Sequence, residues 1–184
     1  MKNLLTIVFI SLTFIISSLA QDSASKRLAL GIYGGVQVPG YGDKHLDVGP
    51  WFGLSVNIPT GLGWCIQFEY NFWKSINNSR EPDEVFFVSE FPLLVGYKWD
   101  FNKYYLQALF GPGIASSGNA LFGGDRDFLV SFNVALKFGL EITNDAEGFI
   151  QVRKQWSGSL NFGGGGGAYN PWLIGLGIQY RISH

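Results

Sequence analysis

Residues 128–142 read FLVSFNVALKFGLEI, and large apolar side chains occupy every second position of this stretch. Phe132 and Leu136 belong to that apolar set, whereas the positions between, apart from Leu129, hold small, polar or charged residues such as Asn133 and Lys137. Successive side chains of a β-strand point to opposite faces of its sheet, so a period of two is typical of a strand. The stretch therefore predicts one long strand with an apolar face and a polar face.

The same alternation predicts seven further strands, which span residues 28–36, 52–58, 62–72, 87–99, 104–110, 149–156 and 172–182. We therefore expect eight strands, typically about 9 to 12 residues long, a length that matches the tilted span of a bilayer. No stretch after the first twenty residues holds the ~18 consecutive apolar residues of a membrane helix.

The predicted connections alternate in length. Long polar or glycine-rich connections follow the odd-numbered strands, at residues 37–49, 74–84, 116–127 and 157–170. Short connections follow the even-numbered strands, at residues 59–61, 100–102 and 143–147. In a closed up-and-down barrel this alternation puts every long loop at one end, and every short turn with both termini at the other.

The polarity of the two strand faces decides which kind of barrel to expect. A membrane barrel carries its apolar band outside and polar groups within, whereas a soluble lipocalin-like barrel reverses them. Here the bulky apolar face is nearly uninterrupted, and the opposite face collects glycine, serine, amides and charges. We therefore predict an all-β fold: a closed, eight-stranded, antiparallel up-and-down transmembrane β-barrel with long extracellular loops and short periplasmic turns. The soluble ligand-binding barrel is the alternative.

The charged residues of the polar face form the first candidate site. Paired acids and bases inside a barrel satisfy one another, as a low-dielectric interior requires, and the inward glycines leave room for their long side chains. The expected ion-pair network of the lumen comprises Glu69, Glu90, Lys98, Lys137, Glu141, Arg153 and Arg181. A proton or ion path through the same groups is the alternative interpretation.

Aromatic residues cluster near the ends of the predicted strands. Two aromatic girdles are typical of the two interfaces of an outer-membrane barrel. At the short-turn end the expected girdle consists of Tyr97, Trp99, Tyr104 and Tyr180. At the long-loop end it consists of Phe72, Phe128, Trp156 and Trp172.

The composition narrows the functional class. Only 15% of residues are charged, 16% are aromatic and 25 are glycine, a profile opposite to that of a disordered chain. A net charge of −1 without any basic run argues against a nucleic-acid partner. The lone Cys65 offers no disulfide framework and no cysteine cluster for a metal, and we expect no cofactor and no metal.

The first twenty residues resemble an export signal. Lys2 supplies a positive start, residues 4–16 an apolar core, and Ser18 to Ala20 a small-x-small cleavage site. We predict a cleaved signal peptide at 1–20 and one barrel domain at 21–184. A signal anchor is the alternative, although the apolar run is shorter than the ~20 residues of a membrane helix.

The predicted loops also hold candidate catalytic residues, and lipid-modifying enzymes do occur on small outer-membrane barrels. His45, flanked by Asp43 and Asp47, could act with Ser116 or Ser117. Such residues are common in any solvated loop, so no catalytic set is assigned and the expected protein is not an enzyme.

A resemblance to a known family rests on the fourth and fifth strands. Residues 90–99 read EFPLLVGYKW and residues 103–113 read KYYLQALFGPG, which together resemble the central hairpin of the Bacteroidetes outer-membrane β-barrel family that includes PorT-like proteins. The likeness extends more loosely to Val152-Arg153 and the final GIQYR. It implies a Gram-negative outer membrane, a barrel of the size of OmpX or the OmpA barrel, and an accessory role in secretion or envelope assembly.

The expected function combines these observations. An eight-stranded barrel has an interior that its own side chains can fill, so it is no open porin. We expect a monomeric outer-membrane protein with a structural or interaction role. Its expected partners are outer-membrane lipid, the barrel assembly machinery and an extracellular or periplasmic protein. The PorT-like accessory factor and, from another class, the lipid-modifying enzyme are the alternatives.

Overall fold

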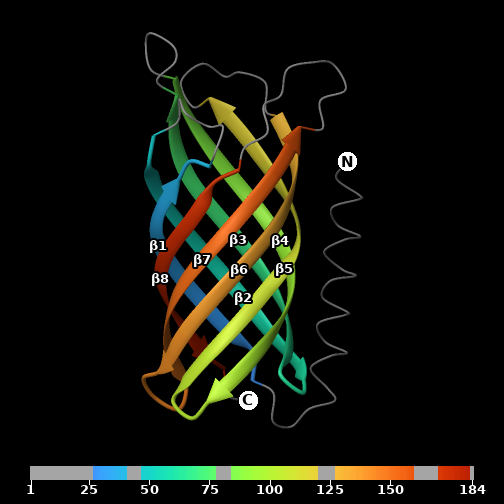
Figure 1. Ribbon diagram of the computed structural model, residues 1–184, viewed down its shortest axis with the longest axis vertical. Helices are drawn as coiled ribbons and strands as arrows, with labels where there is room; N and C mark the ends of the chain where they lie inside the picture. Colours follow the sequence, from blue (N-terminus) through green and yellow to red (C-terminus); the bar gives the residue numbers. More distant parts are fainter. Residues whose placement is uncertain (1–26, 41–46, 78–83, 120–126, 160–169, 183–184) are drawn as a thin grey trace.

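Eight antiparallel strands close into one barrel (Figure 1). The computed structural model describes residues 27–40, 47–77, 84–119, 127–159 and 170–182. The strands are β1 (Ala29–Val38), β2 (Gly49–Gly61), β3 (Trp64–Asn77), β4 (Glu84–Phe101), β5 (Tyr104–Asn119), β6 (Asp127–Glu141), β7 (Ala146–Ser159) and β8 (Trp172–Arg181). Each pairs with its neighbours in sequence, and β8 pairs with β1. The predicted fold class is therefore confirmed.

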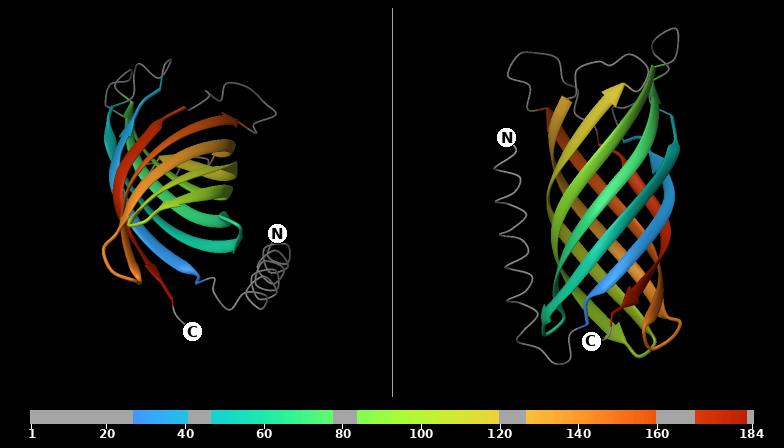
Figure 2. Two further views of the ribbon diagram at one scale, coloured as in Figure 1. Left: turned by 60° about the horizontal axis from the view of Figure 1, so that its bottom comes forward. Right: turned by 180° about the vertical axis from the view of Figure 1, so that it is seen from behind.

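The two ends of the barrel differ. Three short connections, β2 to β3, β4 to β5 and β6 to β7, lie at one end together with the start of β1 and the end of β8, as Figures 1 and 2 show. We call this the turn end and the opposite one the loop end. No helix among the described residues is long and apolar enough to cross a membrane.

The turns after β2 and β4 lie slightly later in the chain than predicted, whereas the turn after β6 lies slightly earlier. Two-residue hairpin turns favour positive φ, and such values occur at Leu62 (51°), Gly63 (84°) and Asn102 (62°). The expected turn at 59–61 was wrong, because Pro59 remains in β2, where the register shifts at a bulge between Pro59 and Gly61. The expected turns at 100–102 and 143–147 were each partly strand, because pairing of the flanking strands extends into them.

Most of the strands are also longer than expected, the exceptions being β6 and β8. The strands span 10 to 18 residues because pairing continues beyond the length needed to cross a bilayer. β3 and β4 remain in register from Lys74↔Phe87 to Asn77↔Glu84, within a segment predicted to be loop. The hairpins thus extend the barrel wall at the loop end.

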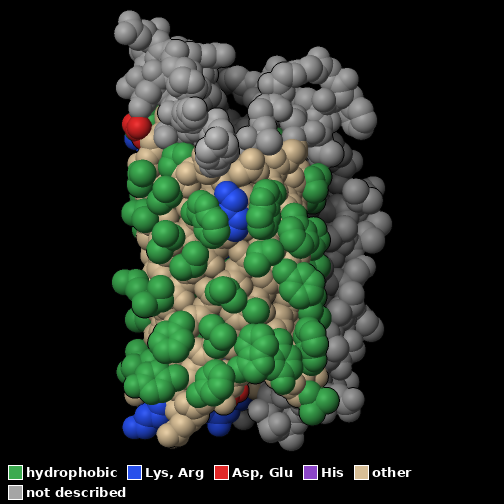
Figure 3. All heavy atoms as spheres, viewed as in Figure 1, with side chains coloured by type: hydrophobic (Ala, Val, Ile, Leu, Met, Phe, Trp, Pro, Cys, Tyr) green, Lys and Arg blue, Asp and Glu red, His purple; other side chains and the backbone are tan. Residues whose placement is uncertain are grey.

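Apolar side chains cover the outside of this barrel. On β6, Phe132 and Leu136 are exposed, whereas Asn133 and Lys137, which each follow one of them, are fully buried. The same alternation holds around the barrel, so that apolar groups form a band over the face drawn in Figure 3. The inner face is therefore the polar one, which contradicts the soluble alternative with an apolar pocket.

Large rings fill much of the inner face, a feature that the sequence interpretation missed. The fully or nearly fully buried inward rings are those of Tyr33, Trp51, Trp73, Tyr105 and Phe149.

Glycines on neighbouring strands make room for these rings. Tyr33 is paired with Gly53 and with Gly177, and Tyr105 with Gly139. A β-carbon on Gly53 or Gly139 would overlap the facing tyrosine ring. The inward glycines were expected to make space for charged side chains, but several of them instead accommodate aromatic rings.

This packing makes Gly139 sensitive to a single added carbon. Gly139→Ala should lower the free energy of unfolding by about 1–3 kcal/mol, because the methyl group displaces the Tyr105 ring within a filled lumen. Gly158→Ala is the control, since its β-carbon would meet no atom within 4 Å. Urea unfolding in lipid vesicles measures both, and equal stability of the two variants would contradict the packing argument.

Candidate functional site: the polar lumen

A buried guanidinium lies at the centre of the lumen. Arg153 on β7 forms an ion pair with Glu69 on β3, and its Nη1 lies 3.8 Å from Oε2 of Glu90 on β4. All three side chains are inaccessible to solvent. The pairing spans the barrel from one wall to the opposite one.

Neutral donors surround the two carboxylates. Glu69 accepts hydrogen bonds from the Tyr33 hydroxyl (2.8 Å), the Asn71 amide (3.2 Å) and the Gln67 amide.

Glu90 is held from the other side. It accepts from the Asn133 amide (2.8 Å) and the Ser131 hydroxyl, both on β6. A buried ion pair is tolerated only when its remaining lone pairs are satisfied in this way. The amides and hydroxyls that alternate with apolar residues on β3 and β6 supply those donors.

Lys137 extends the central cluster along the barrel. Its Nζ donates to Oε1 of Gln67 (3.0 Å), whose amide in turn donates to Glu69. The ammonium also lies 4.7 Å from the centroid of the Phe149 ring, a cation–π contact that stabilises a desolvated charge. Lys137 is thus linked to the central acids through one amide.

A second charged cluster lies nearer the turn end. Glu147 on β7 binds Lys98 (2.8 Å) and Arg181, and Arg181 also binds Glu141 (2.8 Å). The Gln179 amide donates to the same Glu147 carboxylate.

Glu147 was absent from the predicted network. It was missed because residues 143–147 were interpreted as a turn. Glu147 nevertheless lies on the same inward face of β7 as Phe149, Gln151 and Arg153, since alternate residues of a strand share a face. The seven predicted lumen residues occupy the two clusters: Glu69, Glu90, Lys137 and Arg153 lie in the central one, and Lys98, Glu141 and Arg181 in the one near the turn end.

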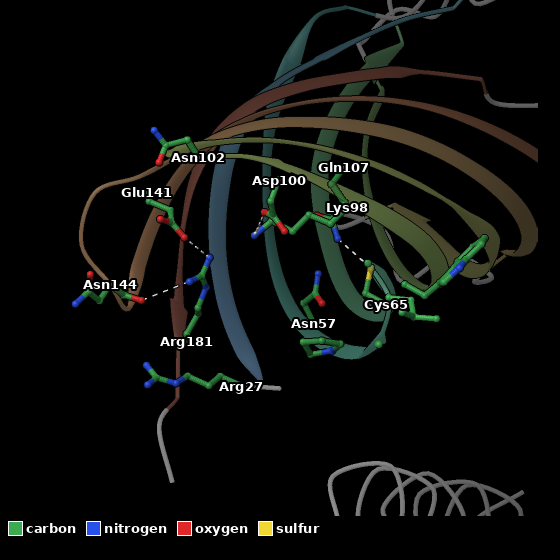
Figure 4. A pocket seen from close by; sticks show the side chains of 15 residues that line it. Arg27, Asn57, Cys65, Lys98, Asp100, Asn102, Gln107, Glu141, Asn144 and Arg181 are labelled. Atoms are coloured by element: carbon green, nitrogen blue, oxygen red, sulfur yellow. Dashed lines mark hydrogen bonds and ion pairs between the residues drawn. The ribbon is translucent and has the colours of Figure 1, made fainter. Parts of the chain in front are cut away.

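A cavity of about 710 Å³ opens beside the second cluster (Figure 4). Charged side chains line its mouth, including Arg27, Lys98 and Arg181. Cys65 and Gln107 form a buried part of its lining, where the Gln107 amide donates to the Cys65 sulfur (3.0 Å). The barrel thus has a vestibule at its turn end.

The predicted girdle residues lie on the outer face. Trp99, Tyr104 and Tyr180 are exposed near the turn end, and Tyr97 packs between Trp99 and Trp64.

At the loop end the second set has the same character. Phe128, Trp156 and Trp172 are exposed, and Phe72 stacks on Phe87. This is the arrangement of an apolar band with an aromatic edge on each side.

Several predicted features lie outside the described residues. They are the signal peptide at 1–20 and two members of the possible catalytic set, Asp43 and His45; the side chain of Ser117 is not described either. Asp47 and Ser116 lie in described segments. Within the described part of the chain no group of three or more His, Cys, Asp or Glu side chains could hold a metal ion.

A closed barrel with an apolar outer band, aromatic edges and a polar lumen defines an integral outer-membrane β-barrel. No family model matches the sequence, and no curated protein does. Solved structures share the fold. Neisserial surface protein A is 14% identical with a TM-score of 0.61, covering 85% of this chain and 97% of its own.

Two further structures show the same architecture. A major outer membrane protein of Thermus thermophilus is 10% identical with a TM-score of 0.59, over 86% of this chain and 100% of its own. Ail of Yersinia pestis, in complex with the heparin analogue sucrose octasulfate, is 14% identical with a TM-score of 0.52, covering 85% of this chain and 97% of its own. At these identities the likeness concerns the fold.

Removing the central cation should strongly destabilise the barrel. Arg153→Met leaves Glu69 and Glu90 buried without their counter-ion, which costs about 3–5 kcal/mol. The double variant Arg153→Met with Glu69→Gln should recover part of that loss, because one uncompensated charge disappears.

Urea unfolding in lipid vesicles measures the free energy of unfolding of the wild type, of Arg153→Met and of the double variant. Lys103→Gln, on an exposed turn, is the control. If Arg153→Met unfolds like the wild type, the cluster contributes nothing to stability.

Proposed function

We propose that the chain is a monomeric, non-enzymatic outer-membrane barrel whose lumen is closed, and that it acts as a structural or interaction protein of the cell envelope. The observation that carries this proposal is the buried Glu69–Arg153–Glu90 pairing across the lumen. Charges held by several hydrogen bonds cannot leave the path of a solute without losing those partners. The pairing therefore supports a lumen that is closed by side chains of the strands themselves rather than an open pore.

The closed lumen predicts no porin-like conductance. Wild-type protein in a planar bilayer should give no lasting conductance steps, because the paired side chains fill the cross-section of an eight-stranded barrel. A general porin in the same bilayer serves as the positive control. Stable steps from the wild type that change with Arg153→Ala would favour the proton or ion path instead.

An accessory role in secretion or envelope assembly is the second candidate. The PorT-like resemblance of residues 90–99 and 103–113 supports it, as does the vestibule at the turn end, which faces the periplasm in the usual orientation of such barrels. The vestibule's mixed charges, Lys98 and Arg181 beside Glu141, suit a polar protein segment.

A photo-crosslinker at the rim of the vestibule tests this candidate. Placed at Leu62, which lines the vestibule and is 93% exposed, it should capture a periplasmic protein in living cells. The same group at Ile174 on the lipid face should capture none. Identical products from both positions would count against the role.

The non-enzymatic proposal has its own test. Deletion of the gene, or His45→Ala, should leave the lipid A and phospholipid composition unchanged by mass spectrometry. A missing or added acyl chain that the wild-type gene restores would instead identify a lipid-modifying enzyme.

A further inference from the structure

Lys154 occupies an unusual place for a charge. It lies on the outward face of β7, between the exposed Val152 and Trp156, and it is paired in register with Trp172 of β8. Burying an ammonium group against hydrocarbon is costly, and basic side chains are sparse within the apolar band of Figure 3. A charge on this face therefore points to a use at the lipid surface.

The contacts of Lys154 place its charge at the membrane edge. Nζ lies 5.0 Å from the ring centroid of Trp172 and 6.0 Å from that of Trp156. It also donates to the backbone carbonyl of Asn170, just before β8 at the loop end. The side chain thus leans from the apolar band toward the interface, as lysines near membrane surfaces do.

The outward charges are distributed unevenly. Among strand residues whose side chains the structure describes, two on the outward face are charged, Lys74 and Lys154. Both are cations, and both lie toward the loop end. An apolar surface whose charges are all positive, and all at one edge, is complementary to a leaflet rich in anionic headgroups.

We propose that Lys154, together with Trp156 and Trp172, forms a binding site for the phosphate group of a membrane lipid in the leaflet at the loop end. Indole rings settle at headgroup level, so both tryptophans place the ammonium where lipid phosphates lie. A lysine ammonium binds a phosphate oxygen through its positive charge and its N–H donors. The indole faces hold the cation in place by cation–π attraction, and the lipid's acyl chains continue along the apolar wall of β7 and β8.

Lipid retention by the intact barrel tests the site. The purified protein is reconstituted with phosphatidylcholine alone or with added bis-phosphorylated lipid A, and the lipids that remain bound are counted by native mass spectrometry. The wild type should retain the phosphorylated lipid in preference to phosphatidylcholine. Lys154→Gln should lower that preference about fivefold, the effect of one basic residue at an anionic surface.

The control variant is Lys103→Gln, which removes an exposed lysine at the turn end and should retain the lipid as the wild type does. Lys154→Arg should keep the preference, because a guanidinium also binds phosphate. All variants must show the heat-modifiable gel shift of a folded barrel, so that a lost preference reflects the site.

Three outcomes would overturn the proposal. Lys154→Gln could retain the lipid as well as the wild type, which would make Lys154 a lysine that only reaches the interface. Lys103→Gln could lose the preference equally, which would reduce the effect to net charge. Inorganic phosphate could compete fully with the lipid at millimolar concentration, which would identify a soluble anion as the ligand.

Discussion

Closure of the sheet is the constraint on which the rest of this structure depends. β1 and β8 pair from Ala29↔Arg181 to Val38↔Trp172, so no strand has a free edge. Inside a bilayer there is no water for unpaired backbone groups, and a sheet satisfies all of them only when it closes. Closure in turn creates two environments, the lipid outside the barrel and the enclosed lumen within it. Successive side chains along each strand therefore face the lipid and the lumen in turn.

The enclosed space imposes a second requirement, because eight strands leave an interior that side chains must fill. Rings over glycines fill part of it. Charges fill the remainder in two groups: Glu69 and Glu90 with Arg153 and Lys137 at the centre, and Glu141, Glu147 and the more exposed Asp100 with Lys98 and Arg181 near the turn end. An unpaired charge would be expensive at this depth, so pairing with opposite charges within each group is what permits so many ionised groups.

Alternation along the strands carried most of what the sequence could predict. Alternation alone assigns Lys137 and Arg153 to the lumen, and the lengths of the segments between the alternating stretches separate long from short connections. Glu147 was missed because the polar run that precedes it resembles a turn, and Trp51 because it adjoins another large residue, Phe52, so that periodicity does not distinguish their faces. The partner of Arg153 was beyond prediction as well: Glu69 is 84 residues away, and their meeting depends on the stagger of strands around the barrel.

Lys137 and Lys154 show how much depends on which face of the barrel wall a side chain occupies. Both ammonium groups lie near aromatic rings, Phe149 in one case and two tryptophans in the other. Lys137 faces inward, where an amide links it to a carboxylate of the same chain. Lys154 faces outward at the loop end, where the two indoles hold its charge at the depth of the lipid headgroups. The ammonium group of Lys137 thus completes an internal network on the inner face of the wall, whereas that of Lys154 lies on the outer face, where the protein meets the membrane.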